Sequence, residues 1–239
     1  MTSGLSGLSG LNEIPKRSGT SSLTPDQISG LQLWYAANAI TGKVDGDTLT
    51  TWTDAGSQLK DLTEATNPPS YRTNVINSLP VVRFDGTNDT LKTSTITSIA
   101  QPLTVFMVVK SNNLSKDRYW DTRITGRTLF GNDSSGYELY AGSSLLTGGT
   151  RDTSWHIFTV IYNGASSVAR RDGTSIISGN PGTGAMTPEF VVGSDGLGAD
   201  FLSGDVAECG VYNVALSTAN HNALGQGLAT KYGLTWNSF

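Results

Sequence analysis

Two stretches decide the fold: LTVFMVVK at Leu103–Lys110 and WHIFTVIY at Trp155–Tyr162. In each of them, apolar residues occupy both alternating faces of an extended chain, which is typical of central strands that are covered on each side. The dipeptides Asn163-Gly164 and Asp172-Gly173 suit turns with positive φ, and they bracket a further candidate strand at Val168–Arg171. This region therefore predicts a meander of adjacent antiparallel strands.

Short apolar runs continue on both sides of this meander, and Gly, Asn and Asp separate them as turns separate strands. Further strands are expected at Leu31–Ala36, Thr48–Trp52, Pro80–Phe84, Thr90–Lys92, Thr128–Gly131, Tyr137–Ala141, Glu189–Gly193 and Gly204–Tyr212. One helix is expected near the end of the chain, with Ser217 as its N-cap and Gly233 as its stop. Its apolar stripe of Leu224, Leu228 and Tyr232 predicts that one helix face packs on a sheet.

Composition agrees with an all-β chain. Among the 239 residues, 37% are hydrophobic, only 15% are charged and 28 are glycine, which favours short strands joined by tight turns within one large domain. The net charge is −4 and the Lys and Arg residues are scattered, so no nucleic-acid partner is expected. No apolar run approaches the roughly 20 residues that cross a bilayer. The N-terminus lacks the pattern of a Sec signal peptide, so neither a membrane nor that export route is expected.

Residues 1–29 differ from the rest and are expected to form an extended N-terminal arm, with the domain covering residues 30–239. The arm carries apolar side chains at Leu5, Leu8, Leu11 and Ile14, but glycines between them disfavour a helix by about 1 kcal/mol each. Two interpretations stay open. The arm is either a flexible tail or a tether whose apolar residues dock on a partner and order during assembly.

Three segments, in this order, resemble the concanavalin A-like, laminin-G-type jelly-roll domains of bacterial surface proteins and bacteriophage structural proteins. The segments are LQLWYA at Leu31–Ala36 with Pro80–Gly86, WHIFTVIYNG at Trp155–Gly164, and GDVAECGVY at Gly204–Tyr212 with the closing helix. The resemblance covers roughly residues 30–235 and diverges at Ser111–Arg127. It implies a two-sheet antiparallel jelly-roll sandwich, a fold that hosts lectins, hydrolases, adhesion modules and virion proteins alike.

Catalytic chemistry is not expected. Related glycoside hydrolases place their acid pair on one strand as Glu-x-Asp, whereas none of the five glutamates here has an Asp two residues later. The two histidines, His156 and His221, are expected in packing roles, and the single cysteine, Cys209, is expected to be a small buried residue. Acidic clusters at Asp45–Asp47, at Asp85–Asp89 and at Asp195 with Asp200 are interpreted as turn chemistry. No metal and no cofactor are therefore expected.

The first hypothesis for function is a non-catalytic virion structural protein of a bacteriophage, such as a capsid decoration or a head- or tail-associated protein. Particles that assemble in the host cytoplasm and leave by lysis would reconcile a lectin-like fold with the missing signal peptide. The arm would then anchor the chain to other virion proteins and the sandwich would face outward. A symmetric homo-oligomer is a further expectation.

The alternative is a carbohydrate-binding adhesion module that acts outside the cell or at its surface. Glycan sites combine aromatic faces with planar polar groups. The best candidate patch lies in the divergent segment, where Tyr119, Trp120 and Arg123 follow one another closely. If that segment is extended, the two neighbouring rings lie on opposite faces, which leaves one of them free to stack on a sugar of the cell surface. The other reading is an edge strand or loop with one ring packed inward.

Overall fold

Strands make up most of the chain in the computed structural model, which describes residues 22–122 and 127–239. The strands are β1 (Leu31–Ala36), β2 (Thr51–Trp52), β3 (Leu62–Thr63), β4 (Ser70–Ile76), β5 (Leu79–Asp85), β6 (Leu91–Thr93), β7 (Leu103–Ser111), β8 (Asp117–Thr122), β9 (Leu129–Asp133), β10 (Gly136–Tyr140), β11 (Leu146–Gly148), β12 (Trp155–Tyr162), β13 (Ser167–Arg171), β14 (Thr174–Gly179), β15 (Phe190–Val192) and β16 (Ser203–Tyr212). The helices are the 3₁₀ turns η1 (Pro25–Gln27) and η2 (Ala37–Ala39) and the α-helix α1 (Thr218–Tyr232).

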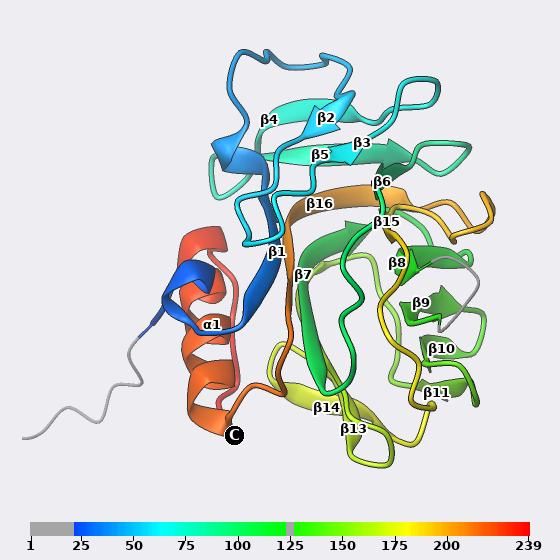
Figure 1. Cartoon of the computed structure of the whole chain (residues 1–239). Helices are drawn as coiled ribbons and strands as arrows, with labels where there is room; N and C mark the ends of the chain where they lie inside the picture. Colours follow the sequence, from blue (N-terminus) through cyan, green and yellow to red (C-terminus); the bar gives the residue numbers. More distant parts are fainter. Residues whose placement is uncertain (1–21, 123–126) are drawn as a thin grey trace, which may run out of the picture.

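The strands form two antiparallel sheets that face each other (Figure 1). Sheet A has the order β14-β13-β12-β7-β16-β5-β4, with β1 also paired to β16. Sheet B has the order β11-β10-β9-β8-β15-β6-β3-β2. The expected all-β sandwich of two antiparallel sheets is thereby confirmed. The arm residues Leu5, Leu8, Leu11 and Ile14 lie outside the described residues.

Strand β7 shows why the doubly apolar stretches lie in the centre of sheet A. Val105, Met107 and Val109 belong to the core between the two sheets, whereas Phe106 and Val108 belong to a second core beneath α1. β7 pairs with β12 on one side and with β16 on the other. The prediction that these stretches are central strands is confirmed. Each large apolar side chain that is fully buried in this way contributes roughly 1.5–3 kcal/mol.

The C-terminal helix α1 covers the outer face of sheet A (Figure 1), and its predicted boundaries are confirmed. The Ser217 hydroxyl accepts the backbone N–H of Asn220 at 3.3 Å, and Gly233 ends the helix in the left-handed region at φ +67°. The predicted stripe of Leu224, Leu228 and Tyr232 is at most 2% exposed. The stripe therefore fixes which face of α1 packs on the sheet.

Residues 22–29 also lie on this side of the sandwich, although the sequence assigns them to the arm. The Leu23 N–H donates to the Ala223 carbonyl at 3.1 Å, and the Tyr212 hydroxyl donates to the Pro25 carbonyl at 2.9 Å. Ile28 is buried in the core beneath α1. A side chain on Gly227 would collide with the Leu23 carbonyl oxygen, so the contact with the helix is close. The structure thus places residues 22–29 with the domain.

The two histidines have opposite environments, which predicts two separate windows of pH-dependent stability. His221 lies in α1, shares a hydrogen bond with the Thr159 hydroxyl and is 1% exposed. Burial, with a smaller contribution from the Arg170 cation, lowers the pKa of His221 to about 4. Burial alone would lower the pKa of His156 as well, but its hydrogen bonds to Asp172 and Asp152, at 2.6 and 2.9 Å, outweigh burial and raise it.

The free energy of unfolding is expected to fall by up to about 3 kcal/mol through His221 as the pH drops from about 6.5 to about 4, because only the unfolded histidine takes up a proton there. His156 contributes fully to the free energy of unfolding below about pH 6.5, and this contribution is lost as the pH rises through the raised pKa of His156. Urea unfolding between pH 4 and 8 tests both. His221→Gln should flatten only the acid window and His156→Gln only the window above 6.5, and an unchanged acid window in His221→Gln would contradict the assignment.

Candidate functional site

Tyr119 and Trp120 do not form the expected exposed patch. They lie in β8 and are 2% and 0% exposed, so neither ring face is open to a sugar and that prediction is wrong. The cause is a β-bulge: Arg118 pairs with Gly131 and Trp120 with Phe130, which leaves Tyr119 as an extra residue. Because a bulge breaks the alternation of side chains, both rings enter the core between the sheets. Arg123 lies outside the described residues.

The same bulge turns Arg118 and Asp121 to the outer face of sheet B. Arg118 is directly opposite Gly131 on β9, which is in turn opposite Glu138 on β10. Since Gly131 has no side chain, the guanidinium of Arg118 extends across β9 and pairs with the Glu138 carboxylate. A second ion pair, of 3.3 Å, joins Arg118 to Asp200. These contacts therefore fix a buried arginine on a face of the sheet that none of the described helices covers.

A second ion-paired group lies beside the first one. Arg127 donates from Nε to both carboxylate oxygens of Asp121, at 2.9 and 3.0 Å, and lies 3.7 Å from the Asp195 carboxylate. Asp121 is fully buried and also accepts the backbone N–H of Gly196 at 3.1 Å. Burial raises the pKa of Asp121, while the hydrogen bonds from Arg127 lower it in part. Asp121 thus holds the loop that contains Gly196 against the sheet.

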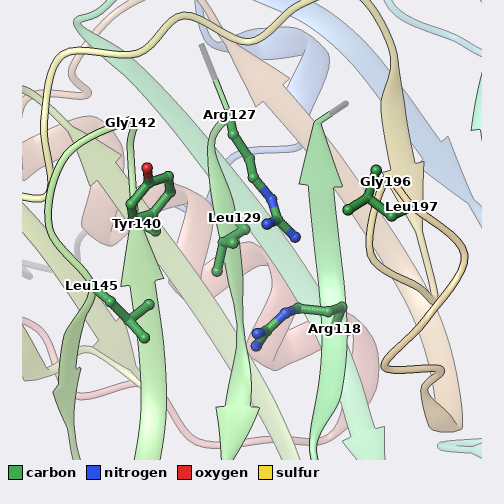
Figure 2. A pocket seen from close by; sticks show the side chains of 8 residues that line it. All are labelled: Arg118, Arg127, Leu129, Tyr140, Gly142, Leu145, Gly196 and Leu197. Atoms are coloured by element: carbon green, nitrogen blue, oxygen red, sulfur yellow. The ribbon is translucent and has the colours of Figure 1, made fainter. Parts of the chain in front are cut away.

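These groups form the floor of a hollow of about 560 Å³ on the outer face of sheet B (Figure 2). We call it the sheet B hollow. Its lining residues are Arg118, Arg127, Leu129, Tyr140, Gly142, Leu145, Gly196 and Leu197. Figure 2 shows both guanidinium groups in the space between β8 and β9, with Tyr140 on the next strand.

Two of the lining residues are unusual because they expose apolar surface. Leu145 and Leu197 are 50% and 66% exposed, and they contribute to the same hollow from two different loops. Tyr140 is half-buried between them and the strands. Exposed apolar side chains that gather around a polar floor are typical of ligand sites. The hollow therefore offers an aromatic ring, aliphatic rims and fixed planar polar groups.

Charge in the hollow is nearly balanced by internal ion pairs. Glu138 faces Arg118, and Asp200 faces both Arg118 and Lys116, the latter at 3.0 Å. One donor is left over, because the Nε of the 5% exposed Arg118 has no hydrogen-bond acceptor within the described residues. A balanced floor of this kind favours an uncharged ligand rich in hydroxyl groups over a polyanion.

Only part of the remaining acidic clusters follows the turn interpretation. An oxygen of Asp85 accepts the backbone N–H groups of Thr87 and Asn88, and one of Asp195 accepts those of Leu197 and Ala199. Asp45 instead accepts the N–H of Thr73 in the distant strand β4, and Asp200 pairs with Arg118 and Lys116. In residues 22–122 and 127–239, no three His, Cys, Asp or Glu side chains gather as a metal site would require. Within the same residues, no helix is long and apolar enough to cross a membrane.

Solved structures with the same fold include enzymes and binding domains. Trypanosoma rangeli sialidase in complex with the inhibitor DANA matches with a TM-score of 0.60 and 14% identity, over 91% of this chain and 36% of that one. The receptor binding domain of botulinum neurotoxin D matches with a TM-score of 0.60 and 12% identity, over 83% of this chain and 53% of that one. The likeness is one of fold alone. The chain spans about a third of the sialidase and half of the toxin chain. No family model matches it, and no curated protein does.

The residues of the hollow were missed in the sequence because no local pattern marks them. Arg118 lies two residues before Trp120, which the sequence wrongly predicts as a glycan-binding residue, but its partner Glu138 is 20 residues away. Tyr140, Leu145 and Leu197 come from three separate segments. Leu145 and Leu197 stand out in Gly- and Ser-rich loops, but single apolar residues on a surface are normal, and Val44 and Leu59 are as exposed without lining the hollow.

Proposed function

We propose that this chain is a non-catalytic carbohydrate-binding β-sandwich whose ligand lies in the sheet B hollow. The observation that carries this proposal is the combination of exposed Leu145 and Leu197 with the half-buried Tyr140 above an ion-paired floor. Sugar rings have apolar faces and a rim of hydroxyls. They are therefore bound by aromatic and aliphatic surfaces together with polar groups held in fixed positions.

The non-catalytic part of the proposal is supported by how the acids near the hollow are used. The usual glycosidase mechanism needs one carboxyl group that donates a proton and a second one that acts as nucleophile or base, both open to the scissile bond. Glu138 and Asp121 do not line the hollow: they are 2% and 0% exposed, and each is bonded to one of the two arginines that do. Incubation with polysaccharides should therefore release no reducing sugar. Cleavage by the purified chain would contradict this part of the proposal.

Tyr140→Ala is expected to weaken binding of a retained polysaccharide about tenfold, a loss of about 1.4 kcal/mol, because it removes the aromatic face of the hollow. Tyr140→Phe keeps the ring and should bind within a few-fold of the original chain. Affinity electrophoresis in gels that contain the polysaccharide measures the change directly. Equal binding by Tyr140→Ala and by the original chain would exclude the hollow as the site.

A matched pair of exposed apolar residues separates the hollow from the general surface. Leu197 and Val44 are 66% and 68% exposed, but only Leu197 lines the hollow. We expect Leu197→Ser to reduce affinity several-fold and Val44→Ser to leave it unchanged in the same gels. Equal losses in both variants would show that binding depends on exposed apolar surface in general.

The second candidate is the virion structural role, in which the part of the arm before Ser22 anchors the chain to neighbouring phage proteins and the sandwich faces outward. It is favoured by the way in which the chain enters the domain, since Leu23 lies on the surface of α1 and leads directly to the preceding residues. The two roles are compatible in one protein. The location would be the virion, assembled in the host cytoplasm, whereas a pure adhesion module would act outside the cell or at its surface.

Truncation tests the anchoring role, and the structure shows where to cut. A chain that begins at Ser22 keeps Leu23 and Ile28, whereas a chain that begins at Gly30 loses both. We expect the second chain to be about 2–4 kcal/mol less stable than the first in urea, because buried apolar area is lost. Only the Ser22 truncation therefore tests anchoring without also destabilising the fold.

Its incorporation into particles, measured by mass spectrometry as copies per shell protein, should fall while its sugar affinity stays the same. Full incorporation would contradict the anchor.

A further inference from the structure

A single row of residues crosses seven strands on the outer face of sheet B. From one edge inward, Thr51 is opposite Thr63, which is opposite Lys92, and Lys92 is opposite Val191, which is opposite Asp121. Beyond the bulge of β8, the row continues with Leu129 opposite Tyr140. Figure 1 shows the strands β2, β3, β6, β15, β8, β9 and β10 following one another in this order.

Hollows follow this row along its whole length. The sheet B hollow lies over β8 to β10, a second hollow of about 180 Å³ lies over β15 and β6, and a third of about 440 Å³ lies over β6, β3 and β2. The first and second share Gly196 and Leu197, and the second and third share Lys92. At about 4.8 Å between neighbouring strands, the six spacings from β2 to β10 give this line of adjoining hollows a length of roughly 29 Å, and we call the line the groove.

The lining changes along the groove in a way that fits a neutral, hydroxyl-rich chain. At the β10 end it is formed by Tyr140 and the leucines, and at the β2 end by Thr51 and Thr63. The charged groups at the β10 end are paired with one another, as described above. In the middle, the Thr90 and Ser194 hydroxyls lie 2.7 Å apart, and the oppositely charged Lys92 and Glu64 line the same hollow. Polar groups with little net charge run throughout, whereas a polyanion would need a line of unpaired cations.

We propose that the ligand is an extended, uncharged polysaccharide that lies in this groove from Tyr140 to Thr63, at right angles to the strands. The protein binds an internal stretch of the sugar chain and not its end. This inference rests on the proposed carbohydrate-binding function and adds the length, direction and charge of the ligand. A terminal sugar would fill only the sheet B hollow. An internal stretch of chain contacts all three hollows, so the affinity grows with chain length until the groove is full.

Affinity electrophoresis of the full chain first shows which of soluble glucan, mannan and galactan slows its migration. Calorimetry then measures the affinity for oligosaccharides prepared from the polysaccharide that binds, from disaccharide to octasaccharide. Thr63→Trp fills the far end of the groove, remote from Tyr140. Ser178→Trp is the control, because Ser178 is an exposed strand residue of sheet A. Alginate, a polyuronate, serves as the anionic comparison.

The expected result is an affinity that rises at least tenfold from disaccharide to octasaccharide, with the rise lost in Thr63→Trp and kept in Ser178→Trp. Disaccharide binding should be the same in all three chains. Disaccharide binding as tight as that of the octasaccharide, with no effect of Thr63→Trp, would overturn the groove and leave a terminal-sugar site in the sheet B hollow. Preferential retention of alginate would overturn the neutral ligand. Retention of none of these polysaccharides would overturn the carbohydrate-binding function itself.

Discussion

Lys231→Ala is expected to lower the free energy of unfolding by about 3–5 kcal/mol, because it leaves a buried carboxylate without its cation. The carboxylate belongs to Glu208, which is 0% exposed in β16 beneath α1. Lys231 Nζ lies 2.6 Å from one of its oxygens. Trp34 Nε1 donates to the other oxygen at 2.6 Å, and the Tyr232 hydroxyl donates to Glu208 at 2.7 Å. This one side chain therefore joins β1, β16 and α1.

Urea unfolding at neutral pH measures the loss, and a second substitution identifies its cause. Adding Glu208→Gln to Lys231→Ala removes the uncompensated charge, and the amide can still pair with both neighbours: its oxygen accepts from Trp34 Nε1 and its NH₂ donates to the Tyr232 hydroxyl oxygen. The double variant should recover part of the lost stability, so the two changes should not be additive. Additive losses, or a loss below 1 kcal/mol in Lys231→Ala alone, would show that the ion pair does not hold the helix on the sheet.

Trp120→Ala is the second change with a large expected effect, again of about 3–5 kcal/mol in stability. The ring is fully buried, stacks on Phe130 with centroids 5.0 Å apart, and donates from Nε1 to the Tyr162 hydroxyl at 3.2 Å. Removing it leaves a cavity in the core between the sheets, whereas the Tyr162 hydroxyl still donates to the Leu129 carbonyl at 2.8 Å. Trp120→Phe should cost clearly less, because most of the volume is kept.

The same variant separates the structural role of Trp120 from the glycan role that the sequence alone predicts. Sugar affinity should be kept in the fraction of Trp120→Ala that remains folded, because the ring does not reach the sheet B hollow. Calorimetry under conditions where the variant is folded measures this. Unchanged stability together with lost sugar binding would restore Trp120 as a ligand residue and contradict the buried placement.

The sequence predicts the centre of the fold and its cover, because both depend on local patterns. The stretches at β7 and β12 are apolar on both faces, so sheet A must be covered on both sides. Sheet B covers one side and α1 covers the other. The helix ends follow from Ser217 and Gly233. Strand β4 has few apolar residues and a register shift between Arg72 and Ile76, so its pattern is not that of a regular strand.

The site could not be predicted in the same way, because it depends on register between distant segments. The bulge at Tyr119 reverses the face on which every later residue of β8 lies, and nothing in the local alternation marks it. The pairing of Arg118 with Glu138 requires Gly131 directly between them on a third strand. The groove appears only when residues from seven strands are aligned, and a single sequence contains no measure of that alignment.

The most direct test of a carbohydrate groove on sheet B is the map of backbone amide shifts when a retained octasaccharide is titrated into the labelled protein. The account predicts changes along the groove, at Thr63, Lys92 and Tyr140 in the strands and at Leu197 in the loop beside them, with the oligosaccharide intact at the end of the titration. Changes confined to sheet A, to α1 or to the loops around Val44, or fragments of the sugar in the spectrum, would contradict it.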